Sequence, residues 1–143
     1  MKKLTLPLLT ILPVVLVMFI AWKIHYSDVA DGASLATENC SDCHDLSDKK
    51  KNRKGPYLWG VVNRRAASAQ GFNYSEAFLR FTGSRQFSWS EPNIDLFITD
   101  PNRLIPGTKM AERNSKSKHA AAFEAIRELK NRKVLITYLR TLK

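Results

Sequence analysis

The chain contains the run Cys40-Ser41-Asp42-Cys43-His44, which holds both of its cysteines. Two thiols three positions apart can each bond to one vinyl group of the same porphyrin, and the imidazole that follows can bind its iron from one side. The Cys-x-x-Cys-His spacing is therefore typical of c-type haem attachment. It predicts one covalent haem c held by Cys40 and Cys43, with His44 as an iron ligand.

Two other interpretations of the cysteine pair stay open on spacing alone. Redox-active disulfides of the thioredoxin type use Cys-x-x-Cys, but there the pair follows a strand of a βαβ unit. No strand pattern precedes Cys40. A zinc site needs two further ligands at suitable spacing, and only His25 and His119 remain among the histidines. Only haem attachment uses a histidine at position 44.

The second axial ligand decides what such an iron can do. An open position suits a haem enzyme or sensor, whereas a second protein ligand suits an electron carrier. Met1 is the initiator and Met18 lies in an apolar segment, which leaves Met110. Met110 ends the run Ile105-Pro106-Gly107-Thr108-Lys109-Met110, where proline and glycine suit a type II turn that could hold a thioether in place. The alternative is a surface methionine without a role.

Five motifs of the chain, taken in order, resemble those of class I cytochromes c, most closely the mitochondrial-type and bacterial membrane-anchored members. They are Cys40-Ser41-Asp42-Cys43-His44, Gly55-Pro56-Tyr57-Leu58-Trp59-Gly60, Gly71-Phe72-Asn73-Tyr74-Ser75, Trp89 and Ile105-Pro106-Gly107-Thr108-Lys109-Met110. The resemblance covers residues 32–110, and residues 132–139 look like the family's last helix. It implies an all-α class I cytochrome c fold around one covalent haem, with His44 and Met110 as axial ligands.

The resemblance also implies roles for five residues around the haem. The carbonyl of Pro56 accepts a hydrogen bond from the free N–H of the proximal imidazole and orients the ring. Arg64, Tyr74 and Trp89 donate hydrogen bonds to a buried haem propionate, whose charge is otherwise costly away from water. Thr108 places a hydroxyl near the distal side. By residue type alone, Pro56 and Thr108 are turn residues, and the other three are core aromatics and a solvated charge.

Three features depart from the family pattern. Phe97 stands where mitochondrial members have a tyrosine that bonds the distal sulfur, so that hydrogen bond is absent. Ala36 replaces the aromatic residue that usually packs the first helix against the last. After Met110 the family's phenylalanine and glycine are missing, and extra residues precede the terminal helix.

Residues 1–26 predict a membrane anchor, followed by a haem domain over residues 27–143. Lys2 and Lys3 precede an apolar run over residues 4–22, in which two threonines are the only polar side chains. This run is close to the length of about 20 residues that crosses a bilayer. Positive flanking charge stays on the cytoplasmic side, which places the haem domain on the opposite side of the membrane.

A cleaved signal peptide is the alternative to an anchor. Its apolar core usually spans about 7–15 residues and is followed shortly by a small-x-small cleavage site. The best such site here, Ala30-Asp31-Gly32, lies well beyond the apolar end. In both cases the haem domain is exported, in agreement with haem attachment outside the cytoplasm. We expect a single-pass protein of the inner (cytoplasmic) membrane with a periplasmic haem domain.

Apolar spacing and capping residues predict helices and no strands. The expected helices span residues 32–41, residues 75–81, the stretch between Ser90 and Pro101, residues 119–129 and residues 135–142. The first carries the cysteines near its end. Ser75 and Ser90 are the expected N-caps, and Pro101 is expected to end the third helix. A break is expected near Asn131.

The chain is basic, with 23 Lys and Arg against 13 Asp and Glu and a net charge of +10. Without Lys2, Lys3 and Lys23, the exported part keeps a net charge of +7. Its basic clusters are residues 49–54, Arg64 with Arg65, and Lys109 with Arg113, Lys116 and Lys118. Such patches steer encounters with acidic protein surfaces. Anionic lipid is the alternative partner, and export argues against nucleic acid.

The resemblance implies a membrane-tethered one-electron carrier, not an enzyme, with no small-molecule substrate because two protein ligands fill the iron. Family partners imply electron flow from a quinol:cytochrome c oxidoreductase to a terminal oxidase of a respiratory chain, through acidic docking surfaces. Two alternatives remain. One is a haem enzyme or sensor in which Met110 is labile, with His119 or water as the other sixth ligand. The other is a fixed haem subunit of an oxidase complex that uses residues 114–130 as an interface.

Overall fold

The computed structural model describes residues 8–84, 86–111 and 125–143. Within these ranges the chain is helical, and its only β pairing is an isolated antiparallel bridge between Arg65 and Ser88. The elements are α1 (Leu8–Asn39), α2 (Glu76–Gly83), α3 (Glu91–Thr99), α4 (Pro101–Leu104), the 3-10 helix η1 (Lys109–Ala111) and α5 (Leu129–Thr141). The predicted all-α fold is confirmed.

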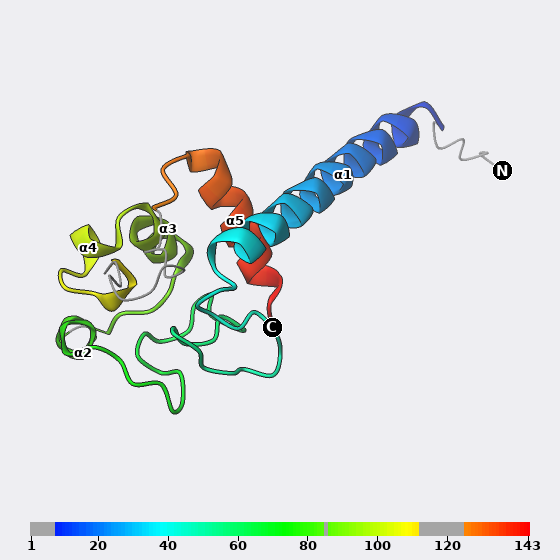
Figure 1. Ribbon diagram of the computed structural model, residues 1–143. Helices are drawn as coiled ribbons and strands as arrows, with labels where there is room; N and C mark the ends of the chain where they lie inside the picture. The colour runs from blue at the N-terminus through cyan, green and yellow to red at the C-terminus, as the bar shows by residue number, and fades with distance from the viewer. Residues whose placement is uncertain (1–7, 85, 112–124) are drawn as a thin grey trace.

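Helix α1 is the longest element and projects from the rest of the molecule (Figure 1). Residues 12–27 are exposed, whereas Gly32 and Ala36 are buried against the domain. The expected helix over residues 32–41 was wrong at both ends. In the structure, this helix is the second half of α1 and is continuous with the apolar segment, because no proline or glycine lies between Pro13 and Gly32. It ends at Asn39, so the cysteines lie in the turn that follows.

Small residues let α1 pack closely against α5. A Cβ atom at Gly32 would overlap the carbonyl oxygen of Val134 and would lie 2.7 Å from the Cβ of Tyr138. One turn further along α1, Ala36 is fully buried at 0% exposure. Alanine in place of the family's aromatic residue at position 36 therefore lets α1 and α5 pack closely against each other.

The predicted caps are confirmed. The hydroxyl of Ser75 accepts a hydrogen bond from the backbone N–H of Phe78, and that of Ser90 accepts one from Asn93. Such caps satisfy N–H groups that the first turn of a helix leaves unpaired. Helix α3 ends just before Pro101, as predicted, and the same proline begins the short helix α4.

The segment before α5 differs from the expectation. Residues 125–128 are not helical, so the predicted helix over residues 119–129 is wrong at its described end, and α5 begins at Leu129 with no break at Asn131. Tertiary hydrogen bonds explain the difference. The N–H of Ile126 donates to the carbonyl of Ile98 over 3.0 Å. Residues 119–124 of the expected helix lie outside the described residues.

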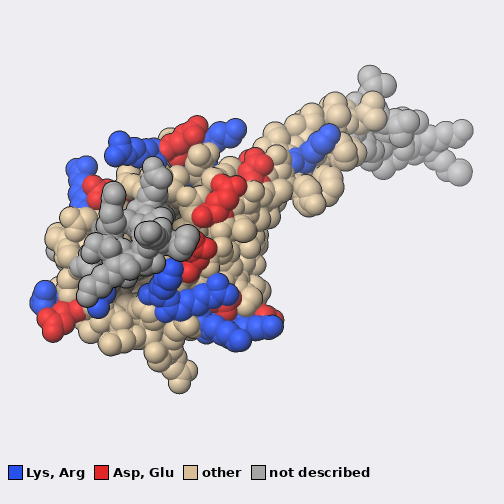
Figure 2. Space-filling view, in the orientation of Figure 1, with Lys and Arg blue, Asp and Glu red and all other residues tan. Residues whose placement is uncertain are grey.

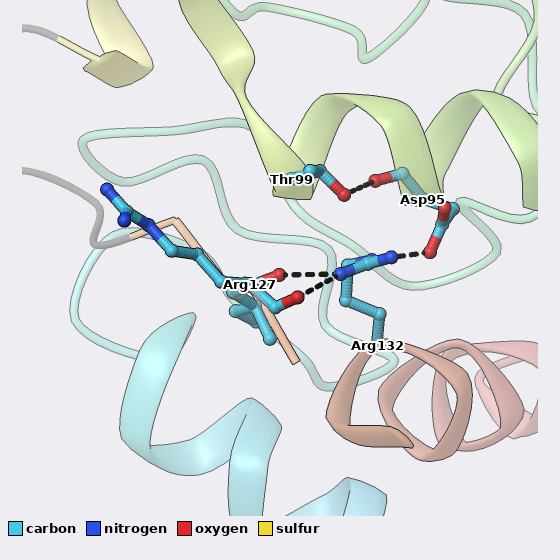
Figure 3. Close-up of polar contacts among 5 residues, drawn as sticks. Asp95, Thr99, Arg127 and Arg132 are labelled. Atoms are coloured by element: carbon cyan, nitrogen blue, oxygen red, sulfur yellow. Dashed lines mark hydrogen bonds and ion pairs between the residues drawn. The ribbon is translucent and has the colours of Figure 1, made fainter. Parts of the chain in front are cut away.

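Arg132 fixes the same segment. Its guanidinium donates to the carbonyls of Ile126 and Arg127 over 3.2 and 2.6 Å, and it pairs with the carboxylate of Asp95 on α3 at 2.7 Å (Figure 3). Thr99 donates to the carbonyl of Asp95 on the same helix. A single buried side chain on α5 thus connects α3 with the chain that enters α5.

The described core consists of two clusters of buried side chains. The first cluster, on the α1 and α5 side, contains Ala36, Cys40, Val61, Ile94, Ile98, Ile126, Leu135, Ile136, Leu139 and Leu142. The second cluster contains Ala66, Phe78, Phe97 and Ile105. Trp89 packs against both clusters and joins them.

Candidate haem site

The cysteine motif forms the turn that leaves α1. The N–H of Cys40 donates to the carbonyl of Ala36 over 2.9 Å, and the N–H of His44 donates to the carbonyl of Cys40 over 2.9 Å. Cys40 is buried in the first cluster and Cys43 is half-buried, and both are free thiols. The turn keeps the two thiols and the imidazole within one short segment at the edge of the core.

The Cys40 thiol lacks the properties of a redox-active thiol. Burial, together with the neighbouring Cys43, raises its pKa to about 11. The cysteines also follow the C-terminal end of a helix, where the helix dipole disfavours negative charge. Reactive redox thiols have a lowered pKa, so the site argues against disulfide exchange. Within the described residues no three His, Cys, Asp or Glu side chains form a group that could hold zinc.

His44 is held in one orientation. Its Nδ1–H donates to the carbonyl of Pro56 over 2.6 Å, because a carbonyl oxygen can only accept. This bond fixes the tautomer and leaves Nε2 as the ring nitrogen with a lone pair for a metal. Burial lowers the pKa of His44, against the opposing effect of the Pro56 bond and with a smaller contribution from the charge of Arg64. A neutral imidazole is the form that binds iron.

Gly55 lies directly against the ring, a role that its residue type alone did not predict. A Cβ at this position would overlap Cε1 of His44 and would lie 2.7 Å from Nδ1. The N–H of Gly55 also donates to the carbonyl of Cys43 over 2.8 Å. Its position directly before Pro56 was the available signal, since a glycine there lets backbone approach the ring closely.

Asp45 anchors the basic loop of residues 49–54 to the motif. Its carboxylate accepts hydrogen bonds from the N–H of Lys51 at 2.8 Å and from the N–H and hydroxyl of Ser47 at 3.1 and 2.8 Å. These bonds lower its pKa to about 2. The guanidinium of Arg53 donates to the carbonyl of Ser41 over 2.9 Å. Positive charge therefore lies beside the cysteine turn.

Arg64 is not the solvated charge that residue type alone suggested. It donates to the carbonyl of Tyr57 over 2.7 Å and to that of Trp59 over 2.9 Å, and its Cζ lies 4.5 Å from the centre of the Tyr57 ring. Burial lowers its pKa, although a guanidinium remains charged in proteins. Two of its five N–H donors serve these carbonyls, which leaves donors for an anionic ligand.

The three residues predicted to bind a propionate come together. The N–H of Trp89 donates to the carbonyl of Arg64 over 2.8 Å. The Tyr74 hydroxyl accepts a hydrogen bond from the N–H of Ala69 over 3.1 Å, so its own proton is directed elsewhere. Burial raises the pKa of Tyr74, and the charge of Arg64 acts in the opposite direction. Their role toward a propionate remains a prediction.

Aromatic side chains connect these residues to the second cluster. The Tyr74 ring stacks on Phe78 with ring centres 5.1 Å apart, and Trp89 lies 6.1 Å from Phe78 and 5.0 Å from Phe97. Such pairs add to the stabilisation from burial. Phe97, which replaces the family's tyrosine, is buried in this row.

The Met110 loop has the turn that the sequence predicts. Gly107 has a φ of +78° and the N–H of Thr108 donates to the carbonyl of Ile105 over 3.0 Å, as a type II turn with Pro106 and Gly107 at its centre requires. Thr108 is buried, and Met110 in η1 packs half-buried against the second cluster. Cys40 and Met110 thus come from different halves of the core. His119, and Arg113, Lys116 and Lys118 of the third basic cluster, lie outside the described residues.

The donor set fits a c-type haem. Two free thiols, an oriented imidazole, a thioether and an arginine with spare donors are the groups that such a cofactor needs for attachment, axial ligation and charge. They arise from the α1 end, the residue 55–64 loop and the Met110 loop, with Trp89 in contact with both halves of the core.

Comparison with known proteins gives the family. No protein-family profile matches this chain. Cytochrome c of Stellaria longipes is 31% identical over 112 residues, covering 78% of this chain and 90% of the relative. The cytochrome c-type cyt cy of Rhodobacter capsulatus is 31% identical over 115 residues, 80% of this chain and 49% of the relative. Cytochrome c2 of Agrobacterium tumefaciens is 37% identical over 84 residues, 59% of this chain and 74% of the relative. The chain therefore belongs to the class I cytochrome c family of electron carriers.

Proposed function

We propose that the protein is a membrane-tethered carrier of single electrons with His44 and Met110 as axial ligands of one covalent haem. The observation that carries this proposal is the bond from His44 Nδ1 to the Pro56 carbonyl at 2.6 Å, with Gly55 against the ring. This bond leaves Nε2 free to bind a metal, and burial favours the neutral form of the imidazole. The bound haem iron supplies the redox chemistry, by alternating between the ferric and ferrous states.

The protein groups around this site favour electron transfer over catalysis. With haem bound, His44 and Met110 would both hold the iron, which would leave no position on it for a small-molecule substrate. Arg64, Tyr74 and Trp89 compensate a propionate charge within the fold. The buried surroundings limit reorganisation of water around the site, because the protein dipoles there are already fixed.

Membrane attachment is supported by the projecting part of α1. This part of the helix is exposed, and it is long and apolar enough to cross a bilayer. A signal sequence near the N-terminus can also be this apolar, so the choice between them rests on the length of the apolar run and on the distant cleavage site. Trp22 and Tyr26 stack with ring centres 6.0 Å apart, as suits an interfacial belt. We assign residues 1–26 to an inner-membrane anchor and residues 27–143 to a periplasmic haem domain.

The proposed partners are respiratory membrane complexes, with a quinol:cytochrome c oxidoreductase as donor and a terminal oxidase as acceptor. The exposed lysines of the residue 49–54 loop lie beside the cysteine turn, where they attract acidic docking surfaces. Figure 2 shows that Lys and Arg side chains gather on the domain and that the projecting part of α1 is nearly free of charge.

The test of this function is the absorption spectrum of the oxidised protein. Wild type should show the weak far-red band of sulfur bound to ferric haem, and Met110→Ala should lose it. Met18→Ala is the matched control and should keep the band, because Met18 lies on the exposed part of α1. Absence of the band from wild type, or binding of carbon monoxide by the reduced wild type at neutral pH, would instead identify an open or labile site.

A further inference from the structure

Helix α1 contains both the proposed membrane span and the first helix of the haem domain. It runs without interruption from Leu8 to Asn39. The nine residues from Lys23 to Asp31, between the span and the domain, contain neither proline nor glycine. The chain therefore has no flexible linker at the point where a tethered domain would need one to swing.

The domain end of α1 is clamped. Gly32 is the only glycine or proline in α1 after Pro13, and it lies where a Cβ would overlap the carbonyl oxygen of Val134. Ala36, at 0% exposure, and Cys40 belong to the same buried cluster as Leu135 and Leu139 of α5. The haem-attachment turn begins directly after this clamp, so it moves with the helix.

The short spacer between membrane and domain does not have to form a helix by itself. Isolated helices shorter than about 12–15 residues are marginal in water because nucleation is costly. Here residues 23–31 extend a longer helix that lies in the proposed bilayer at one end and against α5 at the other. The helix is already nucleated at both ends, so residues 23–31 only have to continue it.

We propose that α1 is a rigid stalk that holds the haem-attachment turn at a fixed height above the membrane. From Trp22 to Asn39 the helix rises about 26 Å at about 1.5 Å per residue. Electron exchange is then confined to partners embedded in the same membrane whose redox surface stands at that height. This inference rests on the proposed membrane anchor.

A rigid stalk and a flexible tether make different demands on a partner. A flexible linker lets a domain search a volume, and its benefit falls gradually as the linker lengthens. On a rigid stalk, the haem domain has a high effective concentration at one height above the membrane. It cannot bind a partner whose docking surface lies at another height, because the geometry forbids contact. The partner is thus a membrane-integral redox protein that the carrier meets by diffusion in the bilayer.

Spin labels test the rigidity directly. Haem attachment consumes both native thiols, so cysteines introduced by Lys23→Cys and Lys130→Cys are the only labelling sites, and both positions are exposed. In the reduced holoprotein in lipid vesicles, the distance between the labels should have one narrow distribution. The same pair with a Gly-Ser-Gly-Ser-Gly insert between Tyr26 and Ser27 should give a broad one. A wild-type distribution as broad as that of the insert would overturn the stalk.

Two inserts of equal length test the fixed height. A seven-residue alanine-rich helical insert between Tyr26 and Ser27 raises the domain by about 10 Å and turns it by only about 20°. We expect it to abolish most of the electron transfer to the oxidase in native membranes. A seven-residue Gly/Ser insert should restore most of it, because the domain can again reach the partner. Equal rates for the wild type and helical insert would overturn the proposal.

Extraction of membranes with alkaline carbonate separates this inference from the proposed function. All variants should stay in the membrane fraction. Release of the wild type would overturn the anchor and the stalk together. Retention combined with a broad label distribution would overturn the stalk alone and leave the tethered carrier intact.

Discussion

At the scale of single residues, the orientation of His44 depends on the absence of a side chain at position 55. Gly55→Ala would place a methyl group inside the van der Waals radius of the imidazole. We expect the holoprotein to lose about 1–3 kcal/mol of stability, the usual effect of overpacking, and its axial ligand bands to shift. Chemical denaturation measures the loss of stability, and absorption spectra measure the shift of the bands.

Gly83→Ala is the matched control for this substitution. Gly83 lies at the end of α2, and a Cβ there would meet no atom within 4 Å beyond its chain neighbours and the backbone of its own helix. Its stability should change by less than about 1 kcal/mol and its spectrum should not change. Equal effects of the two substitutions would show that Gly55 does not support the ring.

The ionised carboxylate of Asp45 stabilises the fold around the cysteine turn, and this stabilisation should be lost at low pH. Its pKa of about 2 lies below its ordinary value of 3.8, because backbone and side-chain donors stabilise the carboxylate. The stabilisation is present above pH 3.8 and is lost as the pH falls through about 2. Asp45→Asn should lower the urea midpoint near neutral pH, since an amide presents one acceptor oxygen instead of two.

The difference between wild type and Asp45→Asn should shrink as the pH approaches about 2. Asp48→Asn, in the same loop at an exposed position, is the control and should have little effect at any pH. Urea titrations at several pH values measure all three proteins. A difference that stays constant down to the acid limit would mean that the Asp45 charge does not matter.

At the scale of elements, Arg132 shows why the entry into α5 is fixed by tertiary contacts. Arg132→Met leaves the carboxylate of Asp95 and two carbonyls without their donor. Hydrogen bonds to charged groups contribute about 1.5–3 kcal/mol, and the Asp95 side chain is 32% exposed, so we expect a loss of about 2 kcal/mol.

Arg140→Met is the control for the Arg132 prediction. Arg140 pairs with Glu91 at 2.8 Å, but its side chain is 50% exposed, and exposed ion pairs contribute at most about 1 kcal/mol. Thermal unfolding of both variants measures the difference. If Arg140→Met destabilised the protein as much as Arg132→Met does, the buried network would not be what holds residues 125–128.

The sequence correctly predicted the helix starts that depend on residues close together in the chain. Ser75 and Ser90 cap helices through groups only three residues away, so composition and spacing were sufficient. The segment around Ile126 has helical spacing but bonds to Ile98 and to Arg132. Such contacts override local preference and leave no trace in a short window of sequence.

In the candidate haem site, too, some contacts could be predicted from the sequence and others could not. His44 and Pro56 could be paired from the resemblance of their motifs, and the Ile105 to Thr108 turn from its proline and glycine. The bonds of Arg64 to the carbonyls of Tyr57 and Trp59 could not be predicted. They depend on how an irregular loop folds back, which residue type does not encode.

At the scale of the whole molecule, one helix links the proposed membrane span to the proposed haem-attachment turn. The sequence indicated an apolar segment and a separate short helix, because the first part of α1 is continuously apolar and its domain end is not. The structure joins them as α1, with its exposed half projecting and its other half packed on α5 (Figure 1). The proposed carrier is thus positioned by a continuous helix from the bilayer to its redox centre.

The mass of the purified protein, expressed with intact haem-maturation machinery, tests the central claim most directly. The account predicts a polypeptide heavier by one haem, with Cys40 and Cys43 both resistant to thiol reagents after denaturation. A polypeptide without haem, whose two thiols are free or joined in a disulfide, would contradict it.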